Sequence, residues 1–379
     1  MAGGGIVLKQ AHAQTIIQAF EKYSPKHLAV EGDKIGLQVG SLQKPVRKVM
    51  VTLDVLEPVV DEAVEAEVDL IIAHHPLLFR PIKVLNTDTA YGRTVEKLIK
   101  HDITVYAAHT NLDVTEGGVN DLMADALQLE NTEVLVPLFE DTLKKLSVFV
   151  PVDHADDLRE ALGNAGAGHI GNYTHCSFST EGRGAFRPEA GADPFIGEPG
   201  KLERPAEEKV ETLFYASEEK KVLQAVKKAH PYEEVAYDIF DMAVPGRKQG
   251  LGRIGRLPEK TTLNDFAEKV KKAFGVEGLR VVGDGSAEVE KVAVLGGDGN
   301  KYAMTALHKG ADVYVTGDLY FHVAHDAWME GLMMIDPGHH VEQIMKQDTA
   351  DRLNNFVKEE KWETEVIVSA VNTDPFRFV

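Results

Sequence analysis

Short runs of apolar, often β-branched residues alternate with amphipathic stretches along the first third of the chain, a pattern typical of strands followed by helices. Strands that alternate with single helices over short connections indicate a mainly parallel sheet covered by helices. In such sheets, ligands gather outside the carboxyl ends of the strands. The predicted strands are Lys48–Asp54, Asp69–Ala73 and Ile103–Ala108, and the predicted helices are Ala11–Tyr23, Glu57–Glu65 and Thr94–His101.

The C-terminal part of the chain repeats this design. The runs Lys291–Val294 and Ala311–Thr316 follow Lys48–Val51 and Val68–Ala73 at one constant offset of 243 residues. A third strand, Leu332–Asp336, again ends in a polar loop. We therefore expect an α/β fold with a duplicated βαβ core in three layers, whose two halves bring their strand ends to one cleft. Chance similarity between two ordinary βαβ units is the alternative.

Residues 143–242 have a different pattern and interrupt this core. Their order of strands and helices predicts an inserted α+β domain of the ferredoxin-like type. The segment Pro188–Pro205, rich in Pro, Gly and acidic residues, is expected to be a mobile loop. Residues 1–142 and 243–379 would then be the two halves of the core. The elements expected in the insert are strand Leu146–Val150, helix Ala155–Ala165, inner strands Cys176–Thr180 and Gly184–Arg187, strand Val210–Tyr215, helix Glu218–Ala229 and strand Tyr237–Asp241.

The composition narrows the class of protein. A chain of 379 residues, 44% of them hydrophobic, can fill two or three cores, yet no run approaches the ~18 apolar residues of a membrane span. A formal net charge of −19 argues against nucleic-acid binding, which requires neutralisation of phosphates. The single cysteine, Cys176, excludes an intrachain disulfide, and the first ten residues lack the apolar core of a signal peptide. We expect a cytoplasmic protein.

Two adjacent histidines, His74 and His75, end the second predicted strand and precede Pro76. Neighbouring side chains of a strand point to opposite faces, so the two imidazoles converge only where the backbone leaves the pleat, which Pro76 favours. For the pair alone, a strand end with one satisfied and one solvated histidine is the commoner explanation.

Further candidate ligands elsewhere in the sequence make a metal site the favoured interpretation of this histidine pair. Asp113 follows the third predicted strand, and His339 and Glu342 lie one helical turn apart after a glycine. Imidazole and carboxylate groups together suit zinc, iron or manganese rather than calcium. We therefore predict a metal site, with room for two ions bridged by a carboxylate.

At these residues the chain resembles the dinuclear-metal Nif-three-like proteins, also called GTP cyclohydrolase 1 type 2 homologs. The resemblance implies two divalent metal ions per chain, zinc as the first choice and iron or manganese next, held by His74, His75, Asp113 and His339 and bridged by Glu342. It also implies a homohexamer, which trimers can build, with the metal sites facing an inner cavity. The matching stretches are Gly36–Gly40, Ala73–Phe79, His109–Asp113, Asp336–His339 with Glu342, and Asn372–Phe376.

The insert resembles that of the longer bacterial members, which is similar to CutA and PII-like trimeric signalling domains. A second ligand or metal site is conceivable there, although isolated loop histidines are mostly solvated or structural. The candidate residues are His169, Asn172, His175, Cys176 and His230-Pro231-Tyr232-Glu233-Glu234. Elsewhere, Gly296-Gly297-Asp298-Gly299 could cradle a phosphate at a helix amino terminus, but a tight turn is the commoner role of such a sequence.

Two functions fit these residues. The first is a metal-dependent hydrolase of a nucleotide or another phosphorylated small molecule, in which a metal-activated water attacks and His109 either relays a proton or orients a ligand. Orientation is the commoner role for such a histidine. The second is a non-catalytic metal-binding or metabolite-sensing assembly in which the insert binds the metabolite. No residue identifies the base of a nucleotide, and only turnover separates the two functions.

Overall fold

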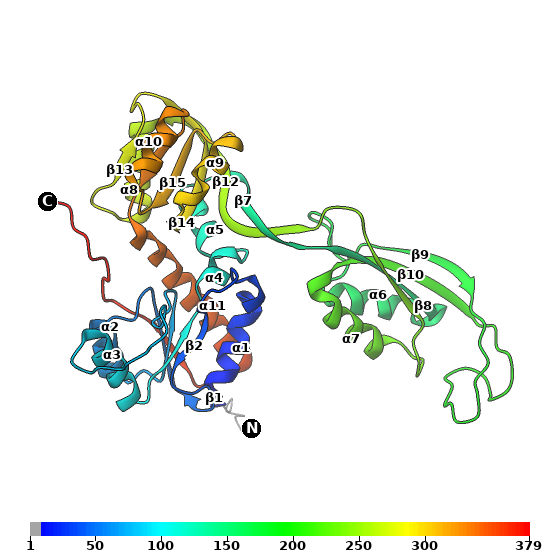
Figure 1. Cartoon of the computed structure of the whole chain (residues 1–379). Helices are drawn as coiled ribbons and strands as arrows, with labels where there is room; N and C mark the ends of the chain where they lie inside the picture. Colours follow the sequence, from blue (N-terminus) through cyan, green and yellow to red (C-terminus); the bar gives the residue numbers. More distant parts are fainter. Residues whose placement is uncertain (1–8) are drawn as a thin grey trace, which may run out of the picture. The chain divides into compact units, whose positions relative to one another are not determined.

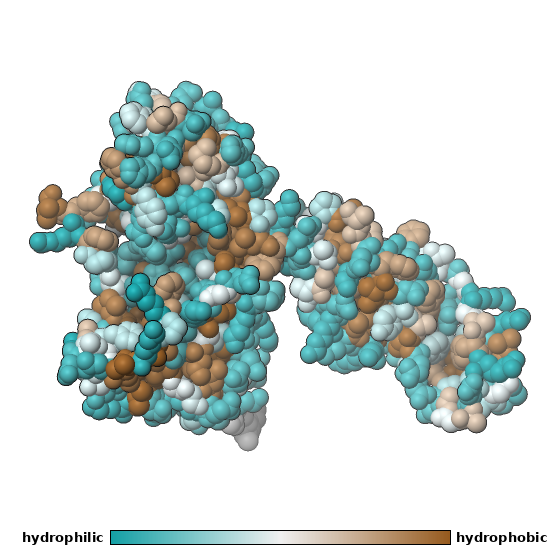
Figure 2. Space-filling model, viewed as in Figure 1, coloured by the Kyte–Doolittle hydropathy of each residue, from teal (hydrophilic) through white to brown (hydrophobic). Residues whose placement is uncertain are grey.

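A computed structural model describes residues 9–379, which form two compact units of mixed α/β structure (Figure 1). The first unit combines the described residues up to Leu138 with Gln249–Val379, and the second is the segment Phe139–Lys248 between them. The surface of both units is largely hydrophilic in the view of Figure 2, with scattered apolar patches. Within the described range, no helix is long and apolar enough to cross a membrane.

One sheet of the first unit has five strands. The four strands β17, β4, β5 and β6 are parallel, and β2 is antiparallel to β6 at the edge. Helices α2 (Glu57–Glu65) and α3 (Ala90–Lys100) connect the parallel strands, and α3 begins earlier than predicted because the Thr89 side chain caps the N–H of Gly92. The strands in spatial order are β17 (Glu365–Val368), β4 (Lys48–Thr52), β5 (Leu70–Ala73), β6 (Thr104–Ala107) and β2 (Gly36–Val39).

The other sheet of this unit has six strands. Its central strands β14, β15 and β16 are parallel, whereas β12 and β13 are antiparallel to their neighbours. Both sheets are therefore mixed, with the parallel pairing at their centres. The strands in spatial order are β13 (Arg280–Val282), β16 (Met333–Asp336), β15 (Val313–Gly317), β14 (Glu288–Asp298), β12 (Arg247–Thr262) and β7 (Glu130–Asp141).

One hydrophobic core contains buried residues of both sheets and of the helices between them, and a second core packs α2 and α3 against the five-stranded sheet. The apolar face of the first helix, with Ile16, Ile17 and Phe20, is fully buried in the first of these cores. These residues are therefore core rather than a free interface. Figure 1 shows one of the helices of this core, α11, running between the sheets. The helices that contribute to the core are α1 (Ala13–Tyr23), α5 (Val119–Ala126), α8 (Leu263–Phe274) and α11 (Met345–Glu360).

The central strands of the two sheets share their register. Val49 of β4 lies opposite Leu70 of β5, and Val292 of β14 lies opposite Val313 of β15, each 243 positions later. The backbone is also capped in the same way at both places. A carboxylate oxygen of Asp69 accepts two N–H groups at the start of β4, at 2.7 and 3.2 Å. An oxygen of Asp312, 243 positions after Asp69, accepts two N–H groups early in β14, at 2.9 and 2.7 Å.

The second unit is an antiparallel four-stranded sheet with two helices on one face. Helices α6 (Ala155–Asn164) and α7 (Glu219–Ala229) pack on the sheet through a core of their own. The prediction of a strand at Gly184–Arg187 is wrong, because a glycine and the following Pro188 interrupt the ladder and only Phe186 forms an isolated bridge, with Glu203. The strands in spatial order are β11 (Tyr237–Asp241), β8 (Leu143–Pro151), β10 (Ala206–Tyr215) and β9 (Ser177–Arg183).

Candidate metal centre

The histidine pair lies at the carboxyl end of β5, as predicted. The backbone N–H groups of His74 and His75 donate to the carbonyls of Thr52 and Leu53 at 3.2 and 2.9 Å, so pairing with the neighbouring segment continues beyond the regular strand. The two imidazole rings nevertheless converge, with centroids 5.1 Å apart. His74 is completely buried, and His75 keeps a partly exposed edge. The strand end therefore presents two imidazoles to one site.

Glu342 lies at the centre of this site. It belongs to a 3-10 helix, His339–Ile344, whose three-residue turn places His339 and Glu342 on the same side. Its Oε2 atom is 3.0 Å from His75 Nε2, 3.2 Å from His339 Nε2 and 3.8 Å from His74 Nε2. One oxygen of a buried carboxylate thus faces three imidazole nitrogens, which is the arrangement expected of a bridging ligand.

Asp113 completes the inner set of candidate ligands. It lies on the short helix α4 (Thr110–Val114), and its Oδ1 is 3.6 Å from His74 Nε2. Both atoms are buried and have no hydrogen-bond partner in the described part of the chain. Because an unpaired buried polar atom costs free energy, this pair fits a cation that both atoms contact.

His109 lies directly beside His74 and His75, although the sequence alone indicated only that it is near the site. Its ring centroid is 5.3 Å from that of His74 and 5.8 Å from that of His75. The three histidines also form one of three groups whose ligand atoms all lie within 4.8 Å of one another. The other two groups are His75, His339 and Glu342, and His74, Asp113 and Glu342.

Every imidazole of the centre is held through Nδ1, which leaves Nε2 directed at the site. Carboxylates that orient a histidine in this way raise its basicity and fix its tautomer. The carboxylates of Asp33, Asp54 and Asp318 were not predicted to hold these rings. Asp54 is nevertheless the last residue of one predicted strand, and Asp318 follows the end of another. The contacts are His74 with the Ala108 carbonyl (3.0 Å), His75 with Asp54 Oδ1 (2.6 Å), His109 with Asp33 Oδ1 (2.9 Å) and His339 with Asp318 Oδ2 (2.7 Å).

The glycine sequence at the end of β14 takes part in the centre in a way that neither a phosphate cradle nor a simple turn explains. Gly297 has a left-handed backbone (φ 64°), and a Cβ atom there would lie 2.7 Å from Glu342 Oε1. A Cβ atom at Gly296 would lie 3.0 Å from the same oxygen. The two glycines therefore leave the space that the Glu342 carboxylate occupies.

The charges of the centre are strongly coupled. Burial alone would raise the pKa of Glu342, but hydrogen bonds from His339 and the neighbouring imidazoles hold it well below its usual range. Burial opposes protonation of His75, yet Asp54 and Glu342 raise its pKa to about 10. The hydrogen bond to Glu342 raises the pKa of His339 to about 9, and burial raises that of Asp113 to about 6.

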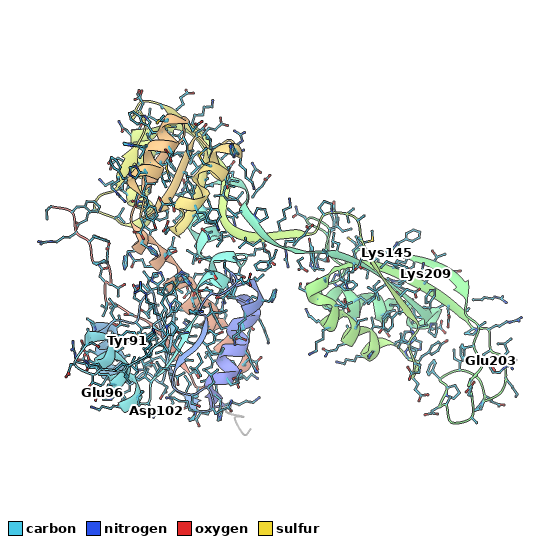
Figure 3. The ribbon with its side chains drawn as sticks, viewed as in Figure 1. Tyr91, Glu96, Asp102, Lys145, Glu203 and Lys209 are labelled. Carbon is cyan, nitrogen blue, oxygen red and sulfur yellow. The ribbon has the colours of Figure 1, made fainter. Side chains whose placement is uncertain are left out.

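A cavity of about 520 Å³ adjoins the centre. His75 and Asp54 lie in its wall, and the remaining wall is mostly apolar, with Leu77 and Tyr91, the latter labelled in Figure 3. A small molecule with an apolar body therefore has room beside the histidines.

The histidines of the second unit do not form a comparable cluster. His169 contacts the Gly166 carbonyl and His175 contacts the Thr174 hydroxyl, and both side chains are exposed. All three groups of candidate metal ligands among residues 9–379 lie in the first unit. The arrangement of the second unit thus gives no support to a metal site there.

Comparisons with known proteins place this geometry in context. The Duf34/NIF3 (NGG1p interacting factor 3) family matches residues 11–375. A GTP cyclohydrolase 1 type 2 homolog of Halalkalibacterium halodurans is 58% identical over 372 residues, covering 98% of this chain and all of the relative, and one of Bacillus subtilis is 58% identical with the same coverage. A solved structure of a Bacillus cereus protein related to NIF3 matches with a TM-score of 0.91 at 56% identity, over 98% of this chain and all of that one.

Proposed function

The chain belongs to the Duf34/NIF3 family, and from this premise we propose that it binds two divalent transition-metal ions. The inner ligands would be His74, His75, Asp113, His339 and Glu342. The observation that carries this proposal is the position of Glu342 Oε2 between three imidazole nitrogens. The two ligand groups that contain Glu342 have no other member in common, which supports two ions that share this carboxylate. Mixed imidazole and carboxylate ligands favour zinc, with iron and manganese as alternatives.

We further propose that the centre hydrolyses a phosphorylated small molecule, such as a nucleotide. Bound ions would supply a nucleophilic water and polarise the bond to be cleaved. His109, with Nδ1 held by Asp33, would present Nε2 as a proton acceptor or donor. The cavity beside His75 would accept the body of the substrate. The names of the relatives make GTP the first compound to test.

Incubation of metal-loaded protein with a panel of nucleotides and phosphomonoesters tests the hydrolase proposal. We expect at least one product that disappears in His74→Ala. The control variant is His101→Ala, because this exposed histidine lies at the end of α3 outside all three ligand groups. Metal analysis of each variant separates loss of metal from loss of activity. Full metal occupancy without turnover of any compound would contradict the hydrolase and leave the metal centre standing.

A non-catalytic sensor is the second candidate function. It is supported by a cavity of about 790 Å³ in the second unit, whose wall residues are remote from the candidate metal ligands along the sequence. In this alternative, the second unit binds a metabolite and the metal centre has a regulatory or structural role. Binding of a compound to the second unit without any turnover would favour it.

We also propose that the molecule is a homohexamer with a duplicated core and a ferredoxin-like insert. The repeated register of the central strands supports the duplication, and the strand order of the second unit supports the insert. Helix α10 (Phe321–Met329) carries the exposed apolar residues Phe321, Trp328 and Met329, which suit a subunit contact. Light scattering tests the hexamer, which should survive a chelator because all inner ligands come from one chain.

A further inference from the structure

The cavity of the second unit lies on the sheet face opposite its two helices. Phe149 of β8 and Lys209 of β10 pair directly and point to this face, because Val148 and Val210 beside them point into the helix-covered core. The irregular segment that follows β9 forms the remaining wall, with Phe186 and Phe195. The cavity encloses about 790 Å³, enough for a small organic molecule.

One buried carboxylate faces this cavity without a cationic partner. Glu207 is 8% exposed, and its Oε1 accepts a hydrogen bond of 3.0 Å from the Tyr232 hydroxyl. No ion pair within the described range includes Glu207, whereas neighbouring Glu208 pairs with Arg159 and Glu211 pairs with Lys209. A largely buried carboxylate with only one neutral donor can accept further hydrogen bonds from a cation that enters the cavity.

Aromatic rings line the cavity on the side of Tyr232, whose hydroxyl contacts this carboxylate. Tyr232 lies at their centre, with ring centroids 5.6 Å from Phe186 and 6.2 Å from Phe195. Its backbone is fixed by His230, whose Nε2 donates to the Phe149 carbonyl (2.9 Å) and whose Nδ1 therefore accepts from the Tyr232 N–H (3.0 Å). Aromatic faces attract cations, and they do so most strongly where water is excluded.

We propose that this cavity binds a small organic cation, an amine or quaternary ammonium compound with an apolar body. The cationic group would lie against Glu207, and the rings of Phe186, Phe195 and Tyr232 would enclose it. This proposal concerns a ligand that the metal centre does not require, and it goes beyond the hydrolase.

The other charges at the cavity are consistent with this choice. Glu181, Glu233 and Glu234 also lie in its wall, so its acidic residues outnumber its basic ones. The Lys209 ammonium, labelled in Figure 3, is held by Glu211 at 2.9 Å and does not neutralise Glu207. Arg183 and Arg187 are exposed. An anionic ligand would use these arginines, and it is the competing outcome of the test.

Titration calorimetry of the full chain with choline tests the proposal, with 3,3-dimethylbutan-1-ol as a neutral compound of the same shape. We expect choline to bind and the neutral analogue to bind at least about tenfold more weakly, because only the cation gains from the carboxylate and the rings. AMP is the anionic probe and should not bind at this cavity.

Two variants locate the binding site. Glu207→Gln keeps the shape of the side chain and an acceptor for Tyr232, and it should weaken choline binding about tenfold or more. Glu198→Gln is the matched control, because Glu198 is exposed and pairs with Lys201 outside the cavity wall, and it should leave binding unchanged. Equal binding of choline and its neutral analogue, no loss in Glu207→Gln, or binding of AMP that depends on Arg183 would each overturn the proposal. Metal content and turnover are unaffected by these variants, so failure here leaves the metal centre standing.

Discussion

The strand ends of the two central sheets occupy equivalent positions in the first unit but contribute to the metal centre in different ways. In the first sheet, β5 runs into His74 and His75, whose Nε2 atoms face the site. In the second sheet, β15 ends in Gly317 and continues to Asp318, each 243 positions later. A Cβ atom at Gly317 would lie 2.9 Å from the His339 backbone, and Asp318 holds the His339 ring. The shared register of the two strand ends thus fixes where a side chain lies, while its chemistry decides whether it is a candidate ligand or orients one.

The shared ligand gives the largest expected effect. Glu342→Gln replaces the only carboxylate oxygen that both ligand groups would use, so most of both ions should be lost from protein purified without chelator. Metal analysis by mass spectrometry measures this, with the exposed Glu359→Gln as control. Retention of full occupancy would mean that Glu342 is not the bridge.

A ligand on one strand end should have a smaller effect than the bridge. His74→Ala removes a ligand from the group with Asp113 and Glu342 and leaves the group with His75 and His339 intact. We expect about one ion per chain to remain. Loss of both ions would show that the two ligand groups do not bind their ions independently. It would contradict the expected difference between the bridging ligand and a ligand of one group.

Metal affinity should depend on pH through His75 and His339. Their pKa values in the metal-free protein, about 10 and about 9, lie above neutrality, so both are protonated at pH 7 and must lose these protons to bind a metal. Affinity should therefore rise with pH up to about 10, by about tenfold per pH unit between about 9 and 10 and by about a hundredfold per pH unit below about 9, where two protons are displaced. Calorimetry in two buffers of different ionisation enthalpy should report proton release near two, and a value near zero would contradict the protonated pair.

An orienting carboxylate should matter less than a ligand. Asp318→Asn leaves all inner ligands in place but weakens the hold on His339, so metal affinity should fall by about 10- to 100-fold. Saturating metal should restore full occupancy, which it would not do for His74→Ala. If Asp318→Asn lost an ion that saturating metal did not restore, Asp318 would be a ligand itself. The distinction between a strand end that supplies ligands and one that orients a ligand would then be wrong.

The smallest expected effect concerns the stability of the two equivalent strands, β4 and β14. Asp69→Ala and Asp312→Ala each remove two hydrogen bonds to a backbone at equivalent places, so each should destabilise its strand by about 1–2 kcal/mol. Hydrogen exchange followed by mass spectrometry should show faster exchange in β4 for the first variant and in β14 for the second. Clearly unequal effects would argue against equivalent scaffolds.

Much of this arrangement could be predicted from the sequence because it is local. Helix Glu57–Glu65 has its predicted bounds, and the resemblance to the Nif-three-like family is confirmed by the family match over residues 11–375. The candidate ligands lie close together because each follows a strand whose apolar run was readable. The metal identity and the assignment of two ions stay predictions.

The features that escaped prediction depend on contacts between distant residues. Asp33 meets His109 across 76 positions, and no local pattern marks an aspartate as the partner of a particular histidine. The absence of a side chain at Gly297 matters only because the Glu342 carboxylate lies next to it, which the sequence does not show. In the second unit, Gly184 leaves the space that the Glu207 carboxylate occupies, so this glycine has a packing role that the predicted strand Gly184–Arg187 did not reveal. These are consequences of tertiary packing.

The position of β17 sets an order of events during translation. This strand, Glu365–Val368, pairs with β4 but is made long after it, once most of the intervening strands and helices have been synthesised. Until then β4 has an unpaired edge, the kind of surface at which nascent chains associate wrongly. His339 and Glu342 emerge late as well. Both candidate ligand groups that contain Glu342 are therefore incomplete until this late segment has been made, so the two proposed ions would be bound only after that point.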